Sequence, residues 1–427
     1  MTNGRALAAL LGTAQLLWAH TLAASPADLF GVGVRSQGMA QTGVARGEHD
    51  HQSYTNPALL GGRDEQHLSL GYQSVAFETS FRAGTERREH DMASATALGV
   101  TLPVPFGGVL ERRLALGLSV VSPRKLVTRA KLWFPERPQF PLLTSQAESL
   151  GLATGLGVEL HPRLRVGAAV RWLANLAGTV VVTGSEDETS TVVNDELLAS
   201  RSAVVGFATQ PIDGLHFGLV WRQAQVSELD VVIRVSELGA LTVPEMHLAG
   251  IAQYDPEQVD AELSLGDGAW QLALGTRYRR WSAFPGFLER TVRCPADEPR
   301  CGSAPPPDPN FSDTWAPRAA LAYGFDITAS ATAEVRLGVG YEPSPIPEQT
   351  GTSNLWDNSR FVGTLGYGLA FELGSVPLSL DLALARHWFR PRTHEKNASA
   401  AALQPKLARV TTGGSIQLVA LALGVTF

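Results

Sequence analysis

The chain has 427 residues, enough for two or three soluble domains or for one large β-barrel. Hydrophobic residues make up 44% of it and charged residues only 18%, below the roughly 25% of a typical soluble protein. The formal net charge of −6 argues against a nucleic-acid-binding protein, and no apolar run after residue 24 is long enough for a membrane helix.

The first residues have the pattern of a secretory signal peptide. Arg5 supplies a positive charge, residues 6–24 are mostly apolar, and small residues follow. Cleavage after Ala23, Ala24 or Ala27 fits this pattern, and we assign residues 1–24 to the signal peptide. A membrane anchor is the alternative, which the polar residues Gln15 and His20 disfavour.

Residues 28–62 are rich in glycine and follow neither a helical nor a strand period. Glycine permits turns and close backbone approach, and Asn56-Pro57 is a turn signal. We therefore expect a compact irregular segment ahead of the first strand.

From residue 65 onward, apolar residues alternate with small or polar ones in segments separated by turns. Alternation places successive side chains on opposite faces of a strand, as in a wall with lipid on one side and a lumen on the other. In the last segment, large apolar residues from Val419 to Phe427 alternate with small ones such as Ala422. The candidate strands are 66–82, 92–104, 112–123, 147–160, 164–183, 199–210, 214–226, 243–254, 269–283, 313–326, 331–343, 359–373, 376–390 and 409–427.

The connections between these segments alternate in length. Short ones such as 161–163 and 374–377 are followed by long polar ones such as 284–312 and 391–408. Short periplasmic turns and long external loops give this alternation in outer-membrane barrels. The stretch 255–268 is the exception, because it should be a short turn and is too long for one.

The second face of the strands separates two fold classes. A soluble β-sandwich would carry Lys, Glu and Thr there, whereas this chain carries mostly Gly and Ala with isolated Arg or Glu. We therefore predict an all-β fold, a transmembrane antiparallel β-barrel of about 14 strands.

Two stretches resemble the FadL/TodX family of outer-membrane transporters for long-chain fatty acids and other hydrophobic compounds. The first is a Gly-rich FG-G-R---M--TG-A pattern followed by Asn56-Pro57-Ala58-Leu59. The second lies within residues 315–371 and contains GVGYEPSPIP and WDNSRFVGTLGY. The resemblance implies that residues 25–64 form a plug inside a barrel of residues 65–427, in the outer membrane of a Gram-negative bacterium. It also implies passive uptake of hydrophobic molecules, with fatty acids as the default substrate.

The resemblance further implies a gate. In the family, the N-P-A motif packs against an inward kink of the third strand, where a lateral opening releases substrate into the membrane. Asn56, Pro57 and Ala58 would hold that gate here. The alternative is that Asn56-Pro57 only turns the chain into the first strand.

Inward-facing arginines are candidates for binding a ligand in the lumen. A fatty acid needs an apolar slot for its tail and a cation for its carboxylate. The alternative is that these arginines pair with acidic residues across strands and stiffen the wall. By strand register the inward cations are Arg171, Arg222, Arg277, Arg279, Arg318 and Arg336.

The loop 124–146 mixes cations with large apolar residues, which suits external capture of an amphipathic anion. Folding of this loop over the barrel rim is the alternative. The capture candidates are Lys131, Leu132, Trp133, Phe134 and Phe140.

The remaining features concern chemistry and assembly. Cys294 and Cys301 suggest a local disulfide in an exported protein, rather than a metal or redox pair. The cluster at residues 48–51 has side chains that bind metals, but we favour a polar hairpin and expect no metal or cofactor.

No catalytic motif is found, so we do not expect an enzyme. The terminal Phe427 fits the aromatic that outer-membrane barrels present to their assembly machinery. The expected partners are a hydrophobic small molecule, outer-membrane lipid and that machinery, with the protein as a monomer. A structural or adhesion barrel, and an uptake channel for aromatic hydrocarbons, are the alternatives.

Overall fold

The computed structural model describes residues 31–47, 50–108, 111–124, 134–144, 150–184, 189–236, 245–293 and 308–427. Strands dominate these residues, and among them no helix is long and apolar enough to span a membrane. The strands are β1 (His67–Ala83), β2 (Thr85–Pro103), β3 (Leu114–Pro123), β4 (Gly151–His161), β5 (Leu164–Gly184), β6 (Thr189–Ile212), β7 (Leu215–Arg222), β8 (Gln225–Ser236), β9 (Glu245–Asp255), β10 (Gln258–Leu265), β11 (Trp270–Arg279), β12 (Leu288–Arg293), β13 (Thr314–Thr328), β14 (Ala331–Glu342), β15 (Arg360–Leu373), β16 (Val376–Phe389), β17 (Arg392–Glu395) and β18 (Arg409–Thr426). The helices are α3 (Val34–Gly38), α4 (Gln52–Thr55), η2 (Pro57–Leu60), α5 (Pro141–Thr144), η5 (Trp281–Ala283), α6 (Ala398–Leu403) and η6 (Pro405–Leu407).

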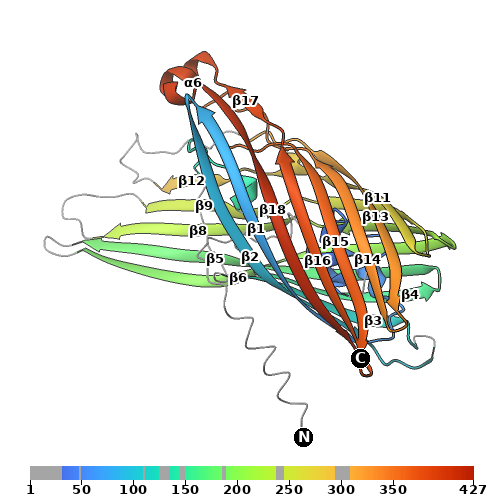
Figure 1. Cartoon of the computed structure of the whole chain (residues 1–427). Coiled ribbons are helices and arrows are strands. Elements are labelled where there is room, and N and C mark those ends of the chain that lie inside the picture. Colours follow the sequence, from blue (N-terminus) through green and yellow to red (C-terminus); the bar gives the residue numbers. More distant parts are fainter. Residues whose placement is uncertain are drawn as a thin grey trace, which may run out of the picture.

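Fourteen of these strands close into a barrel (Figure 1). The wall runs β1-β2-β3-β4-β5-β6-β7-β10-β11-β13-β14-β15-β16-β18, and β18 pairs with β1 along the length of both strands. Every pairing in this wall is antiparallel. Because β18 pairs back with β1, no edge of the wall is left open to lipid. The prediction of a transmembrane antiparallel β-barrel of about 14 strands is confirmed.

The prediction that 243–254 is the eighth wall strand is wrong. β9 pairs with β8 and β12, which are not wall strands, and the eighth wall strand is β10. The sequence pattern misled because Asp260 and Glu262 make β10 look like a polar turn, although both carboxylates are buried inside the barrel. The stretch 255–268 was too long for a turn because it contains a strand.

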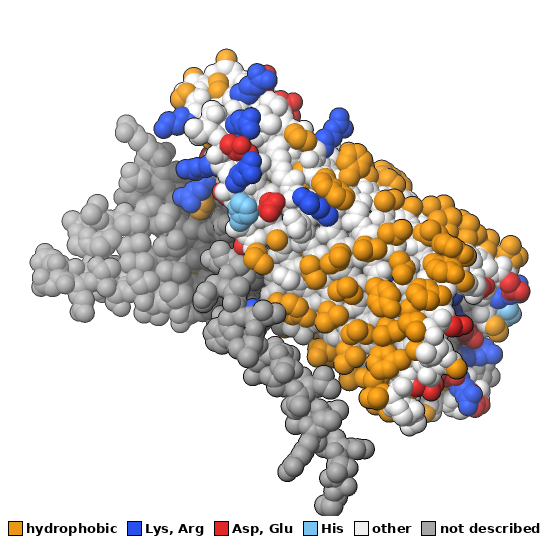
Figure 2. Space-filling view, viewed as in Figure 1, with side chains coloured by type: hydrophobic (Ala, Val, Ile, Leu, Met, Phe, Trp, Pro, Cys, Tyr) orange, Lys and Arg blue, Asp and Glu red, His pale blue; other side chains and the backbone are white. Residues whose placement is uncertain are grey.

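The two faces of the wall differ as the alternation predicts. On β18, Val419 and Leu421 are exposed on the outside, whereas Ala420 and Ala422 are buried on the inside. Figure 2 shows the outward apolar side chains as a broad band across the face of the barrel in view. This band is the surface that faces the lipid hydrocarbon.

Aromatic residues border the apolar band. Near the periplasmic end, the ring centroids of Trp270 and Tyr323 lie 4.3 Å apart, and near the outer end those of Tyr278 and Trp315 lie 4.9 Å apart. Such girdles mark the two membrane interfaces of a barrel. The chain's C-terminus lies at the end with the short turns, and α6 and β17 lie at the opposite end (Figure 1).

The outer ends of β5 and β6 project beyond the wall. There β5 pairs in parallel with β8, and β8 continues to β9 and β12 (Figure 1). The described part of the chain thus adds a sheet extension to one side of the outer rim.

The position of β10 in the wall predicts the effect of a charge on its outer face. Leu263 lies between Phe217 of β7 and Leu274 of β11 and faces the lipid. We expect Leu263→Arg to lower the stability of the folded barrel by about 2–4 kcal/mol, as for charges near the bilayer midplane. Denaturant unfolding in lipid vesicles measures this loss. Leu403→Arg on the exposed helix α6 is the control, and equal stability of the two variants would contradict the placement of β10.

Candidate functional site

Residues 31–47 and 50–62 lie inside the barrel, and we call them the plug segment. Its helix η2 contacts β3, β4, β5 and β6, and its helix α3 contacts β14, β15, β16 and β18. Asn56 is fully buried: its side chain accepts a hydrogen bond from the Ala58 amide (3.0 Å) and donates to the carbonyls of Val44 (2.6 Å) and Phe207 (3.2 Å). Asn56 therefore fixes the turn of the chain and also joins two parts of the plug segment to β6.

Three wall glycines receive the Asn56-Pro57 turn. A Cβ atom on Gly157 would lie 2.5 Å from the Pro57 carbonyl oxygen, and one on Gly167 would lie 2.3 Å from the same group. A Cβ atom on Gly206 would lie 2.1 Å from Asn56 Oδ1. No side chain fits at these positions, so we call Gly157, Gly167 and Gly206 the glycine seat.

The glycine seat lies on β4, β5 and β6, one to three strands away from the third strand that the family resemblance implies for the N-P-A contact. Contacts with β3 come from other plug residues: Ser53 Oγ lies 2.7 Å from Ser119 Oγ, and Leu60 packs over Gly117. Both ladders of β3 run without a register shift. The glycine seat was not predicted. Its signal in the sequence is a set of inward glycines that pair with one another on adjacent strands, Gly157 with Gly167 and Gly167 with Gly206.

The other half of the plug segment is held by wall carboxylates. Glu262 of β10 accepts hydrogen bonds from the amides of Gly43 (2.7 Å), Val44 (3.0 Å) and Ala45 (3.2 Å). Arg35 forms an ion pair with Glu334 of β14 at 3.1 Å. Backbone amides that converge on one buried carboxylate satisfy its charge without a second side chain.

Arginines that the sequence places inside the barrel also hold the plug segment. Arg222 donates to the carbonyls of Tyr54 (3.1 Å) and Thr55 (2.6 Å), and it forms an ion pair with Asp260. Arg277 donates from Nε to the other oxygen of Asp260 at 2.6 Å. Two wall arginines therefore share one buried carboxylate, and one of them is bonded directly to the plug backbone.

All six predicted arginines lie on the inner side of the wall, and each has an acidic partner among the described residues. The alternative that they pair across strands is therefore the arrangement that the structure contains. The remaining pairs are Arg171–Asp255 (3.7 Å), Arg279–Glu342 (2.8 Å), Arg318–Glu342 (3.1 Å) and Arg336 with Glu334 and Asp381.

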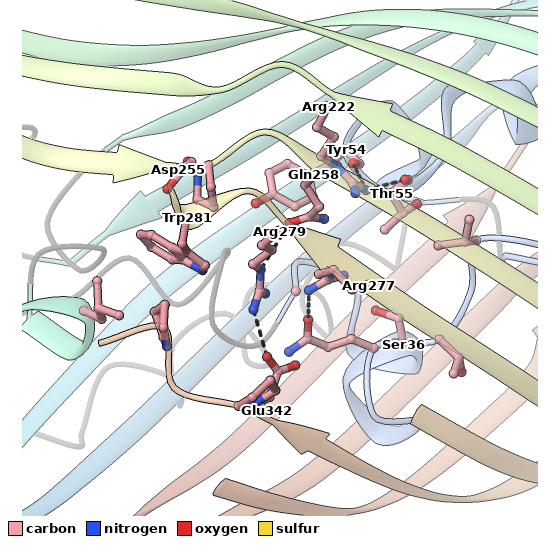
Figure 3. Close-up of a pocket in the computed structure, with 18 of the residues that line it drawn as sticks. Ser36, Tyr54, Thr55, Arg222, Asp255, Gln258, Arg277, Arg279, Trp281 and Glu342 are labelled. Atoms are coloured by element: carbon pink, nitrogen blue, oxygen red, sulfur yellow. Dashed lines mark hydrogen bonds and ion pairs between the residues drawn. The ribbon is translucent and has the colours of Figure 1, made fainter. Parts of the chain in front are cut away.

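A cavity of about 70 Å³ lies between the plug segment and the outer loops. Figure 3 shows Arg222, Arg277 and Arg279 reaching toward it from the wall, with Tyr54 and Thr55 on the plug side. Asp357, in the outer loop before β15, also lines it, and burial raises the pKa of this carboxyl above its ordinary value. The lining is therefore rich in charge, with arginine as the most frequent residue type.

An aromatic cluster lies at the outer side of this cavity. Trp281 belongs to both, and its ring packs against Tyr254 (5.9 Å between centroids) and Phe311 (6.1 Å). Leu142, Ile346 and Leu355 complete the buried cluster, together with Phe284 and Phe287. The sequence alone does not reveal this cluster, because its members come from separate outer segments that only the fold brings together.

The wall opposite the arginines is apolar. Val75, Phe77 and Phe81 of β1 are buried toward the lumen, next to Ile416 and Leu418 of β18. Trp356 and Phe140 from the outer loops pack over this apolar column, and Val34 of the plug segment belongs to the same cluster. The lumen above the plug segment thus has one charged side and one apolar side.

Several residues predicted for the capture loop and the disulfide are not described by the structure. Lys131, Leu132 and Trp133 of the capture loop lie outside the described residues, as do Cys294 and Cys301.

Of the other capture candidates, Phe134 is half-buried beneath the Arg137 guanidinium, and Phe140 is buried against Trp356. Folding of the loop over the rim is thus what the structure shows for Phe140.

The candidate metal cluster at residues 48–51 is only partly described, because residues 48 and 49 lie outside the described part of the chain. His51 Nε2 lies 3.6 Å from a carboxylate oxygen of Asp50, and burial lowers the pKa of His51. Within the described residues, no group of three or more His, Cys, Asp or Glu side chains could hold a metal ion.

Comparison with known proteins identifies relatives of this architecture. A family model described as "Outer membrane protein transport protein (OMPP1/FadL/TodX)" matches residues 16–427. A Pseudomonas aeruginosa FadL homologue aligns over 93% of this chain and 98% of its own, with 14% identity and a TM-score of 0.61. The Pseudomonas putida toluene transporter TodX aligns over 94% and 99%, with 12% identity and a TM-score of 0.54. The monoaromatic hydrocarbon channel CymD aligns over 94% and 98%, with 14% identity and a TM-score of 0.52. No curated protein sequence matches the chain.

Proposed function

Because the chain belongs to the OMPP1/FadL/TodX family of outer-membrane transport proteins, we propose that it carries hydrophobic small molecules passively into the cell, with long-chain fatty acids as the first substrate class. The observation that carries this proposal is the two-sided lumen. The arginines of β7 and β11 line the cavity and offer donors for a carboxylate. The apolar column of β1 and β18 would hold a tail once Trp356 and Phe140, which cover it, move aside.

Aromatic hydrocarbons are the second substrate class. The aromatic cluster around Trp281 favours them, because ring stacking adds to the free energy of burying a flat apolar molecule. Two proteins of similar fold are a toluene transporter and a monoaromatic hydrocarbon channel.

The proposed route begins at the aromatic cluster and continues into the cavity above the plug segment. A cavity of about 150 Å³ is known to accept benzene, so a cavity of about 70 Å³ must widen before any such molecule enters. Displacement of the plug segment from the glycine seat is the movement that would widen it.

The exit is proposed to be lateral, near β3. On the periplasmic side of the plug segment lies a wider cavity of about 640 Å³, and charged residues such as Arg35, Asp50 and Asp381 line it. A hydrophobic molecule gains free energy by entering lipid rather than this polar space. Because both ladders of β3 are intact, the exit requires a local opening of the wall.

Two further proposals concern the assembly of the barrel and its oligomeric state. Phe427 is exposed at the periplasmic end of the wall and is proposed as the residue that the barrel assembly machinery recognises. The closed wall leaves no edge of its own for pairing with a second copy, which supports a monomer.

Uptake of labelled oleate and labelled toluene tests this function and its substrate class. Cells that contain the protein should accumulate oleate severalfold faster than cells that lack it. If the two kinds of cell took up oleate at equal rates, and also toluene at equal rates, a non-transporting barrel would be favoured. Arg279→Gln removes a cavity cation. It should slow the uptake of oleate and leave that of toluene unchanged, because only oleate carries a carboxylate. Arg163→Gln, in a periplasmic turn, is the matched control, and no effect of Arg279→Gln on oleate would exclude this arginine as a ligand.

A further inference from the structure

The outer edge of the wall is charged differently on its two sides. We define the basic face as the outward side of β16, β18, β1 and β2 at the outer end of the apolar band. It carries exposed arginines. Figure 2 shows basic side chains, coloured blue, above the apolar surface. The basic face belongs neither to the lumen nor to the plug segment, so transport does not explain it.

Strand register places these arginines relative to the outer aromatic girdle. Trp388 of β16 pairs with Phe361 of β15, which pairs with Tyr341 of β14, and these residues form one row of the girdle. Arg386 lies one outward position below Trp388, with its guanidinium 5.9 Å from the centre of the indole ring. Arg390 lies one outward position above Trp388, directly after the end of β16. The two arginines therefore bracket the girdle.

Strand pairing connects Trp388 to the neighbouring strands β18, β1 and β2. Trp388 pairs with Ser415, Ser415 pairs with Glu78, and Glu78 pairs with His90. One outward position higher, Arg88 of β2 pairs with Ser80 of β1, and Arg82 lies one position higher again.

Two residues of strand span about 7 Å, which a strand tilt of about 45° reduces to about 5 Å of height. Arg82 thus lies about 10 Å above Glu78, and Arg88 about 5 Å above His90, beyond the outer end of the apolar band.

The arginines of the basic face are only partly compensated. Glu86 bonds to both Arg82 (3.2 Å) and Arg88 (3.1 Å), so one carboxylate serves two guanidinium groups. Glu78 is engaged with Ser415 Oγ at 3.2 Å. On β18, the exposed Arg409 pairs with Glu395 of β17 at 3.3 Å. Among the described residues, the basic face with this partner therefore carries five arginines against three glutamates.

The opposite side of the rim has the reverse charge. There Glu257 accepts from Trp221 Nε1 and pairs with Arg280, and Asp313 accepts from the Tyr278 hydroxyl. Two carboxylates thus face one arginine at the outer edge of β7, β11 and β13. The excess of positive charge is a local property of the basic face and not of the whole rim.

We propose that the basic face is a docking surface for the phosphate groups of the glycolipid that forms the outer leaflet of the outer membrane. The apolar band below it is already the surface that contacts the acyl chains of that leaflet, so one lipid molecule can occupy both. Guanidinium groups bind phosphate through paired, charge-assisted hydrogen bonds. Basic residues next to a membrane surface attract anionic headgroups, each with a modest contribution.

The test compares two forms of one lipid with the full-length protein in detergent. The probes are lipid A with two phosphates and the same lipid after phosphatase treatment. Binding is measured as the concentration that gives half of the maximal rise in the unfolding temperature. The phosphorylated lipid should bind at least tenfold more tightly, and equal binding of the two forms would overturn the proposal.

A variant localises the site. Replacing four arginines of the basic face by glutamine should weaken the binding of phosphorylated lipid A about tenfold and abolish the preference for phosphate. Retention of the folded barrel is checked by its heat-dependent mobility in gels. Unchanged binding, or an equal loss in the control, would show that the basic face is not the site. The substitutions are R82Q, R88Q, R386Q and R390Q, and the control replaces exposed arginines elsewhere: R112Q, R137Q, R163Q and R280Q.

Discussion

Replacement of Gly206 by valine is expected to open the lumen while the barrel stays folded. A Cβ atom at this position would lie 2.1 Å from Asn56 Oδ1 and 2.9 Å from Pro57 Cδ, so the turn at the base of the plug segment must move. Overpacking of this kind typically costs about 1–3 kcal/mol. The displaced Asn56 would also lose its hydrogen bonds to Val44 and Phe207. Permeation of a small polar dye into vesicles that contain the variant measures the opening, and we expect a severalfold increase.

The control for this prediction is Gly324→Val. Gly324 is also a wall glycine, on β13, but the nearest atom to its added Cβ would be 3.8 Å away. Its replacement should leave dye permeation at the level of the unmodified protein. If Gly206→Val gave no more permeation than Gly324→Val, the glycine seat would not hold the plug segment. A variant that lost the folded barrel would be recognised by its gel mobility, and Gly206→Ala then provides a milder test at the same position.

The barrel could be predicted from the sequence because the lipid imposes a period of two on every wall strand. Lipid-facing residues such as Val419 and Leu421 must be apolar, whereas the lumen accepts small or charged residues. This constraint fails where the lumen side carries two acids in a short strand, as in β10. Asp260 and Glu262 could be placed only once their partners from distant parts of the chain were known.

The functional site was less predictable, since its contacts join residues far apart in the chain. Strand register indicates which arginines face the lumen, but it contains no information on whether a given arginine contacts a ligand, a carboxylate or the plug backbone. Arg222 bonds to carbonyl groups of residues 54 and 55, a contact between segments separated by more than 160 positions. The aromatic cluster around Trp281 has the same origin, because no single loop contains enough of it to form a pattern.

Loss of the carboxylate of Asp260 is expected to destabilise the protein more than loss of any single lumen arginine. Asp260 is buried and compensates two buried guanidinium groups, those of Arg222 and Arg277. Removal of one partner from a buried ion pair typically costs about 3–5 kcal/mol, because the remaining charge has no counterion and little water. Asp260→Asn keeps the shape of the side chain and removes only the charge. Unfolding by denaturant in detergent micelles should show the loss.

The exposed pair Arg280–Glu257 provides the control for this charge effect. Its groups are 3.3 Å apart and both are solvent-exposed, so Glu257→Gln should lower the free energy of unfolding by at most about 1 kcal/mol. A second test replaces Arg222 by methionine in the Asp260→Asn background. Removing the uncompensated charge should restore part of the lost stability, and dye permeation should rise because the carbonyls of Tyr54 and Thr55 lose their donor. If the double variant were less stable than Asp260→Asn alone, Arg222 would act mainly as the anchor of the plug segment, and its bonds to the plug would outweigh its uncompensated charge.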